Sequence, residues 1–212
     1  HKTMSNVGKS NLTHEEIGRN LHSEMPKFSS GHGHENKSSN FYSFIGKKKY
    51  RHSAVLIPLI YKDNETKIIL TVRSKSLPTH AGQISFPGGK VDQSDGDALE
   101  TATREAGEEI GLRIEDLTIH GFLDICKTGT NYMILPVVGT INRSYIPTLN
   151  HREVDRIIYL PLDFIRDKSN LKEKMKIIDG VERYFFVYEY KGYNIWGATA
   201  KMLKLLSEKV FD

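Results

Sequence analysis

Three glutamates within five residues form the pattern in the sequence that is best suited to chemistry. They are Glu105, Glu108 and Glu109, in the run REAGEE that starts at Arg104. An α-helix turns by about 100° per residue, so Glu109 lies about 40° to one side of Glu105 and Glu108 about 60° to the other. Three carboxylates in one wedge repel one another unless a positive charge lies among them. A hard divalent cation such as Mg²⁺ meets this need, because it binds carboxylate oxygens and keeps water and phosphate oxygens as its other ligands.

The alternative interpretation of the three acids is a solvated helix face, since runs of charge are usually exposed and Glu favours helices. Three neighbouring features oppose it. Arg104 is adjacent and can orient one carboxylate, and Gly111 ends the helix directly after the acids. The glycine pair at 88–89 follows Phe86-Pro87, as a turn at the end of a strand requires. We therefore expect a helix that presents metal ligands.

The acidic run also resembles the Nudix hydrolase box, G-x5-E-x7-R-E-U-x-E-E-x-G-U, in which U is apolar. The second half of the box matches from Arg104 to Leu112 without a mismatch. The first half departs from it: counted from Gly89, Arg104 comes one residue late, and either Asp95 or Gly96 fills the Glu position. The coenzyme A diphosphatase branch of this family carries the longer form with Asp, so the departure points to that branch.

An upstream segment resembles the signature of the same branch, LLTxR(S/A)x3Rx3Gx3FPGG. Residues 70–74 (LTVRS) are followed at the right spacing by residues 82–89 (GQISFPGG), and Pro78 stands where the signature has its second Arg. Residues 193–200 (YNIWGATA) also resemble this branch, so the resemblance spans residues 51–206. The missing Arg bears on the substrate and not on the type of reaction.

The acidic run and the resemblance together imply the centre of an active site. Glu105, Glu108 and Glu109 are the expected ligands of Mg²⁺ or Mn²⁺, and a carboxylate that does not bind the metal serves as general base for the attacking water. Glu153 is a further catalytic candidate, because the branch has Glu-Val ahead of a Pro-Leu strand end, here Pro161-Leu162. A surface Glu at the start of a strand is the alternative for Glu153.

The residues around this centre receive expected roles as well. Arg73 is the expected phosphate or pantetheine contact, and for His80 and Gln83 ordinary loop polarity is the alternative to a substrate contact. Arg104 is expected to be structural, and Trp196 to lie in the core rather than to stack on a base. The expected substrate-binding residues are Arg73, Ser74, His80, Gly82, Gln83, Gly88 and Gly89, the last two because glycine lets the backbone approach a phosphate.

The length and composition of the chain limit its possible partners and cellular location. The chain has 212 residues and a net charge of +4, of which residues 1–52 carry +5 and residues 53–212 carry −1. The basic character thus belongs to the N-terminal arm, which argues against a nucleic-acid partner for the folded domain. No apolar run approaches the roughly 18 residues of a membrane helix, so no membrane partner is expected. The single cysteine, Cys126, excludes an intramolecular disulfide and suits a reducing compartment, with the cytoplasm as the default location and an organelle as the alternative.

The periodicity of the sequence predicts an α+β fold in which a mixed β-sheet lies between helices, and the Nudix resemblance implies the same fold. Residues 1–46 are expected to form an arm, with a short helix capped by Thr13 and Glu16 and a flexible linker at 29–43, and residues 47–212 the Nudix domain. Expected helices are 98–110, 162–167 and 198–209. Expected strands are 54–61, 67–73, 118–125, 132–141, 156–160, 176–178, 184–190 and 193–196.

The function favoured by these patterns is metal-dependent hydrolysis of coenzyme A or acyl-coenzyme A to 3′,5′-ADP and 4′-phosphopantetheine or its acyl form. One alternative is a Nudix diphosphatase for another nucleoside-diphosphate derivative, such as a dinucleotide, ADP-ribose or capped RNA. The other is a non-catalytic Nudix binding module, which the retention of all three glutamates opposes. The expected partner is a small-molecule substrate, and a homodimer stays open.

Overall fold

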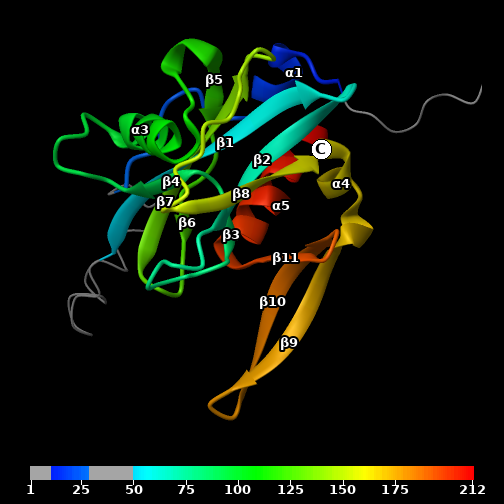
Figure 1. Cartoon of the computed structure of the whole chain (residues 1–212). Coiled ribbons are helices and arrows are strands. Elements are labelled where there is room, and N and C mark those ends of the chain that lie inside the picture. The colour runs from blue at the N-terminus through cyan, green and yellow to red at the C-terminus, as the bar shows by residue number, and fades with distance from the viewer. Residues whose placement is uncertain (1–10, 29–49) are drawn as a thin grey trace, which may run out of the picture.

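A mixed β-sheet forms the centre of the computed structural model, which describes residues 11–28 and 50–212 (Figure 1). The strands run in the order β3-β2-β1-β7-β5, with β4 paired to β1, β6 to β7 and β8 to β2. The long central pair β1 and β7 is parallel, and the other pairs are antiparallel. The bounds are β1 (Arg51–Lys62), β2 (Glu65–Arg73), β3 (Ile84–Ser85), β4 (Gly88–Lys90), β5 (Leu117–Phe122), β6 (Cys126–Lys127), β7 (Tyr132–Ile141) and β8 (Val154–Pro161).

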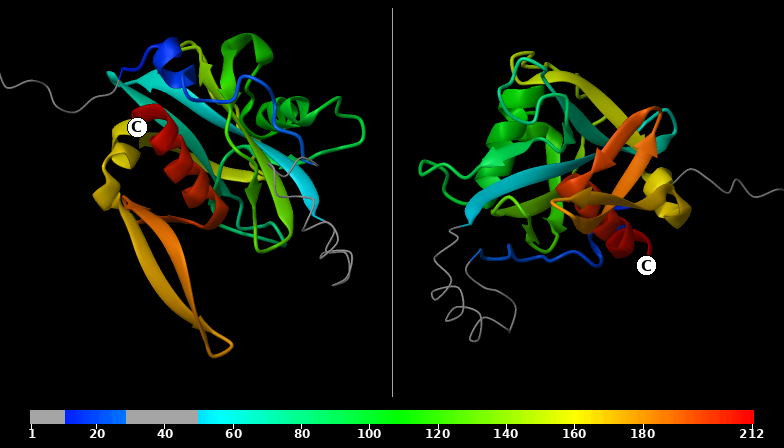
Figure 2. Two further views of the ribbon diagram at one scale, coloured as in Figure 1. Left: turned by 180° about the vertical axis from the view of Figure 1, so that it is seen from behind. Right: turned by 90° about the horizontal axis from the view of Figure 1, so that it is seen from below.

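Helices cover both faces of this sheet, as Figure 2 shows. On one face α3 (Ala98–Ile110) packs Ala98, Ala102, Ala106 and Ile110 against the sheet. On the other face α5 (Gly197–Phe211) and the short α4 (Leu162–Arg166) bury their apolar residues in a second cluster. Two 3₁₀ turns, Ile114–Asp116 and Lys168–Asn170, complete the connections. The expected α+β architecture, with a mixed sheet between helices, is confirmed. None of the helices in the described ranges is long and apolar enough to cross a membrane.

The helix near the N-terminus packs against the domain. The helix α1 (His14–Gly18) has the expected capping box, because the Thr13 side chain accepts from the Glu16 amide and the Glu16 side chain accepts in return. Ile17 is 1% exposed in the cluster beneath α5. Further along, His22 exchanges two backbone hydrogen bonds of 2.9 Å with Phe122. Residues 11–28 therefore pack against the folded body, whereas the linker expected at 29–43 lies outside the described residues.

A second, three-stranded sheet follows the main one in the chain. It consists of β9 (Leu171–Ile178), β10 (Val181–Tyr190) and β11 (Tyr193–Trp196), in the order β11-β10-β9. Its base is anchored by Tyr188 and Ile195, which are buried against the α5 side of the core. The rest of the β9–β10 hairpin projects away from the body of the domain (Figure 1). Strands were expected here at 176–178, 184–190 and 193–196; the structure extends the first two into one long hairpin and confirms the third.

Candidate active site

The glycine pair on β4 brings the backbone of the sheet into direct contact with α3. Gly89 pairs with Ala54 and Gly88 with Val55 on the neighbouring strand β1. A Cβ atom at Gly89 would lie 2.6 Å from the Glu105 carboxylate, and one at Gly88 would lie 2.4 Å from the Ala54 carbonyl oxygen. At Gly88 the clash is with backbone, so only glycine fits there, and at Gly89 a side chain would displace the Glu105 carboxylate. The pair thus creates a cradle in which the Glu105 carboxylate lies against bare backbone.

The helix α3 is held at both ends in the orientation that turns its acids towards this cradle. At its start, the Asp97 side chain accepts from the Glu100 amide at 2.8 Å. At its end, Gly111 adopts a left-handed conformation with φ of 70°, and its amide donates to carbonyls of the last turn. A Cβ atom at Gly111 would also lie 2.8 Å from the Thr148 side chain. These ends match the expected helix at 98–110.

A cavity of about 190 Å³ opens between α3, β4 and the ends of β2 and β8. Glu105 and Glu109 reach it from the helix, and Glu153 reaches it from the segment before β8. The structure thus brings together three acids that are up to 48 positions apart in the chain. Glu108 is not among the residues that line the cavity, and its side chain is 52% exposed.

The surroundings of the cavity disfavour the charged forms of Glu105 and Glu109. Burial raises the pKa of Glu109 to about 8, and the negative charges of Glu105 and Glu153 add to this rise, while the Gly88 amide and Arg73 oppose it. Burial also raises the pKa of Glu105, against the opposing effect of Arg104. Carboxyl groups that share a cavity in this way favour either a proton or a cation. An all-oxygen donor set at a glycine cradle fits a hard divalent cation such as Mg²⁺ or Mn²⁺.

The acids still have to rearrange to hold one ion together. Among the described residues, no three Asp, Glu, His or Cys side chains already stand in a common ligand geometry. Arg104 helps to keep the acids out of a common ligand geometry, because its Nη1 lies 3.2 Å from Glu105 Oε1 and 3.3 Å from Glu108 Oε1. Rotation of Glu108 away from Arg104 would bring a third helix carboxylate towards the cavity.

Arg73, the last residue of β2, lines the same cavity. Its Nη2 donates weakly to the Thr79 carbonyl oxygen at 3.5 Å. Its Nε is the only side-chain nitrogen or oxygen in residues 11–28 and 50–212 that is buried without a hydrogen-bond partner. A buried donor without a partner costs free energy, which a bound anion would recover.

The other expected substrate residues divide into two groups. Gly88 and Gly89 line the cavity, whereas Ser74, His80, Gly82 and Gln83 do not. The Ser74 hydroxyl is instead engaged with that of Ser76 at 2.8 Å. Its backbone amide donates to the Glu153 carbonyl oxygen at 2.8 Å, so Ser74 positions the segment that carries Glu153. His80 and Gly82 are exposed in the loop between β2 and β3, where both have positive φ angles.

Several lining residues were not singled out from the sequence. Thr71 and Ser85 pair across β2 and β3, and the Thr71 hydroxyl donates to the Ser85 carbonyl oxygen at 3.2 Å. Leu77 and Val154 supply the apolar part of the wall. Thr71 and Ser85 lie inside the two signature strings, so their neighbourhood was visible in the sequence although their own roles were not.

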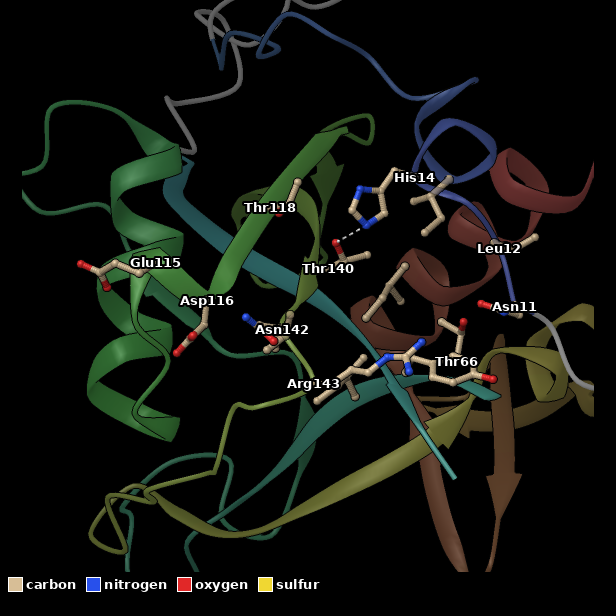
Figure 3. Close-up of a pocket in the computed structure, with 15 residues that line it drawn as sticks. Asn11, Leu12, His14, Thr66, Glu115, Asp116, Thr118, Thr140, Asn142 and Arg143 are labelled. Carbon is tan, nitrogen blue, oxygen red and sulfur yellow. Dashed lines mark hydrogen bonds between the residues drawn. The ribbon is translucent and has the colours of Figure 1, made fainter. Parts of the chain in front are cut away.

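A larger cavity of about 450 Å³ lies at the other end of β1 (Figure 3). Its walls include His14 near α1, Thr140 on β7 and Arg143, whose guanidinium lies 4.2 Å from the centre of the Tyr61 ring. It contains none of the three helix glutamates and neither glycine of the cradle. We therefore assign the chemistry to the smaller cavity.

Comparison with known proteins places the chain in a family. The model of the NUDIX domain matches residues 50–178. The Nudix hydrolase NudL of Photorhabdus laumondii is 34% identical over 160 residues, which cover 76% of this chain and 85% of that protein. Nudix hydrolase 22, chloroplastic, of Arabidopsis thaliana is 36% identical over 161 residues, which cover 72% of this chain and 53% of that protein. An Ap4A hydrolase of C. elegans has 24% identity and a TM-score of 0.45, and the match covers 54% of this chain and 83% of that one.

The chain belongs to the Nudix family, and it is accordingly a hydrolase of nucleoside-diphosphate derivatives. Enzymes of this family generally use a divalent metal such as Mg²⁺ or Mn²⁺. The α+β fold and the acidic cavity described above agree with this membership.

Proposed function

We propose that the protein hydrolyses the diphosphate bond of coenzyme A or acyl-coenzyme A and releases 3′,5′-ADP and 4′-phosphopantetheine or its acyl form. The observation that carries this proposal is the place of Arg73, which lines the cavity that also holds Glu105, Glu109 and Glu153 and whose buried Nε has no hydrogen-bond partner in residues 11–28 and 50–212. Arg73 belongs to the upstream signature of the coenzyme A branch, and the cradle glycines end that signature. The signature and the acidic helix thus meet at one cavity.

Each group of the cavity has a role in this reaction. Glu105 and Glu109, with Glu108 after rotation, would hold Mg²⁺ or Mn²⁺. When bound, such an ion would supply positive charge that neutralises the diphosphate, activates the attacking water and stabilises the leaving oxygen. Arg73 supplies a charge-assisted hydrogen bond to a phosphate oxygen. The bare backbone at Gly88 and Gly89 lets the diphosphate approach the sheet closely.

A base for the attacking water is the remaining requirement. We assign this role to Glu153, because it enters the cavity from a different element than the helix acids, and in residues 11–28 and 50–212 the ion pairs of Arg104 are with Asp95, Glu105 and Glu108 and not with Glu153. A carboxylate in this position can accept the proton of the water as the new P–O bond forms. Glu153→Gln should therefore lower turnover and leave binding of the metal largely intact.

A substrate panel tests the proposal. Coenzyme A, acetyl-coenzyme A, dephospho-coenzyme A, ADP-ribose, dinucleoside polyphosphates and capped RNA are incubated with the protein and Mg²⁺ or Mn²⁺, and products are identified by mass. We expect coenzyme A species to be cleaved fastest, with 3′,5′-ADP as one product and with dephospho-coenzyme A poorer. Faster cleavage of any of the other three classes would assign the protein to another nucleoside-diphosphate derivative. No cleavage in the panel, with retained binding, would favour a binding module.

A further inference from the structure

Large exposed apolar side chains are concentrated on the projecting sheet. Eight such side chains are exposed in the described ranges 11–28 and 50–212, and six of them lie on β9–β11. Their exposed fractions are 47% for Met175, 64% for Ile177, 47% for Ile178, 51% for Val181, 63% for Tyr184 and 51% for Trp196. Trp196 was expected in the core, and this expectation is wrong. Exposed apolar side chains concentrated on a projecting element indicate an interaction surface.

The strand register divides the β9–β10 hairpin into two faces of opposite charge. Side chains of alternate residues point to opposite sides of a strand, and residues that are directly paired share a side. Lys176 pairs with Arg183 and Ile178 with Val181, so all four lie on one face. We call this the basic face and define it as Lys172, Lys174, Lys176, Ile178, Val181 and Arg183. The opposite face carries Glu173 and Glu182 and neither Lys nor Arg.

The basic face has positive charge that the protein does not neutralise. Glu189 pairs with Lys172 at 3.1 Å and also with Lys174. Lys176 and Arg183 have no carboxylate partner among residues 11–28 and 50–212, although they lie directly opposite each other. Like charges in this arrangement destabilise a hairpin. An external anion would remove this repulsion.

Three of the six exposed apolar side chains, Ile178, Val181 and Trp196, lie on the same side as the cations, whereas Met175, Ile177 and Tyr184 lie on the opposite face. Ile178 and Val181 form an exposed pair at the tip, next to the turn at Asp179 and Gly180. At the base, the exposed Trp196 ring lies 6.5 Å from Phe185 in an edge-on arrangement. Lysine stems, aliphatic tips and an indole ring together suit the boundary between lipid head groups and acyl chains.

We propose that the basic face docks on the surface of an anionic lipid bilayer. The positive charge attracts acidic head groups, while Ile178 and Val181 enter the head-group region. A second copy of the chain fits less well, because a two-fold dimer would place one basic face on the other, and three lysines along the free edge of β9 oppose strand pairing. A nucleic acid would leave the aliphatic tip without a partner. The sequence did not indicate this surface, because the expectation of no membrane partner considered only membrane-spanning helices.

The hairpin is separate from the catalytic cavity, so the two can be tested independently. No residue of β9 or β10 lines the cavity of Glu105 and Glu109. Changes at the hairpin tip should therefore leave hydrolysis of a soluble substrate unchanged. This makes the rate on a soluble substrate a control for folding in every variant.

Sedimentation of the full chain with vesicles tests the proposal. Vesicles of phosphatidylcholine alone are compared with vesicles that also contain phosphatidylserine, at low and high salt. We expect binding to the phosphatidylserine vesicles only, with weakening at high salt. Each Lys or Arg near such a surface contributes roughly fivefold in affinity, so Lys176→Glu with Arg183→Glu should weaken binding by at least roughly 25-fold. Ile178→Ser with Val181→Ser should weaken it at both salt concentrations.

Matched control variants change the same chemistry elsewhere on the surface. Lys62→Glu with Lys168→Glu reverses two exposed charges, and Ile114→Ser with Ile146→Ser removes two exposed apolar side chains. Neither pair should reduce vesicle binding more than slightly. The proposal is overturned by equal binding to neutral vesicles, by no binding to either vesicle, or by equal losses in the control variants. Hairpin-dependent dimerisation, or hairpin-dependent binding of single-stranded RNA without vesicle binding, would overturn it as well.

Discussion

Asp95 holds Arg104 through both of its carboxylate oxygens. Arg104 Nε lies 2.9 Å from Asp95 Oδ1, and Arg104 Nη2 lies 3.0 Å from Asp95 Oδ2. The Asp95 side chain is only 1% exposed and also accepts from the Asp92 amide and the Thr101 hydroxyl. The pairing with Arg104 holds the pKa of Asp95 far below its usual range. Asp95, and not Gly96, therefore fills the Glu position of the Nudix box, and Arg104 has the structural role expected of it.

Replacement of Asp95 by Asn tests the importance of this pair. Arg104 would lose its charged partner and turn fully towards Glu105 and Glu108, where it competes with a cation for the carboxylates. Loss of a residue that positions metal ligands typically costs roughly 10–100-fold in metal affinity or activity. We expect the metal concentration for half-maximal activity to rise by this factor and the melting temperature to fall. Asp92→Asn, which removes a carboxylate from the same loop but not from Arg104, is the control and should change neither value appreciably.

Glu109 is the helix acid that is most buried in the cavity, at 8% exposed. Glu109→Gln preserves the size of the side chain and removes the charge that would hold the cation. We expect turnover to fall on the order of a thousandfold, equivalent to about 4 kcal/mol of barrier, while circular dichroism shows a folded protein. The metal-induced rise in melting temperature should also disappear. A folded Glu109→Gln protein with near-normal turnover would refute the role of Glu109 as a ligand.

The sequence predicted the acidic helix well because the residues that determine where the helix starts, ends and packs are close together in the chain. Apolar spacing, the cap at Asp97 and the stop at Gly111 all lie within the helix or next to it. The Glu153 placement depends instead on the pairing of β2 with β8, and a spacing of 44 residues from Glu109 contains no such information. Whether Asp95 or Gly96 fills the Glu position of the Nudix box likewise depends on how the loop before α3 folds, which the sequence does not show. Trp196 was misplaced because an aromatic residue in a strand-like run resembles core, although its face of the small sheet is open.

The imidazole of His120 makes one pH-dependent contribution to the stability of the protein. Burial lowers the pKa of His120, and the neighbouring His14 lowers it further; its Nε2 also lies 2.8 Å from the Thr140 hydroxyl. The unfolded chain, with an ordinary pKa of about 6.5, therefore binds more protons than the folded one. This contribution to stability is present above pH ~6.5 and is lost as the pH falls through the folded pKa.

We accordingly expect acidification across this range to lower the free energy of unfolding of the wild-type protein relative to that of His120→Gln. The raised pKa values of Glu105 and Glu109 act in the opposite direction in both proteins and cancel in this comparison. Urea unfolding of the metal-free protein at a series of pH values measures both slopes. His151→Gln, at an exposed histidine in the loop before β8, serves as the control. Parallel slopes for the wild-type protein and His120→Gln would contradict the prediction.

The burial of Ile17 implies that the N-terminal segment contributes to stability, although this segment is remote from the catalytic cavity. The side chain is almost fully buried beneath α5, and truncation of a buried Ile to Ala costs about 2–5 kcal/mol. Ile17→Ala should therefore lower the free energy of unfolding by this amount, while turnover at a temperature where the protein is folded stays the same. Deletion of residues 1–28 should destabilise the domain more strongly, whereas deletion of residues 1–10 leaves Ile17 in place. A deletion of 1–28 with unchanged stability would show that the segment is dispensable.

Replacement of Pro78 by Arg is expected to increase the affinity for the substrate. Pro78 stands where the signature of the coenzyme A branch has an Arg, and it is exposed next to Leu77, which lines the cavity. An Arg at this position would place a second cation beside Arg73 at the cavity wall. A hydrogen bond to a charged group contributes about 1.5–3 kcal/mol, so we expect Pro78→Arg to lower KM for coenzyme A by roughly tenfold at unchanged kcat. Pro78→Ala separates the effect of the new charge from that of a more flexible loop, and it should leave KM close to that of the wild-type protein. If Pro78→Arg and Pro78→Ala had the same KM, the loop between β2 and β3 would not contact the substrate, and the proposed coenzyme A specificity would depend on Arg73 alone.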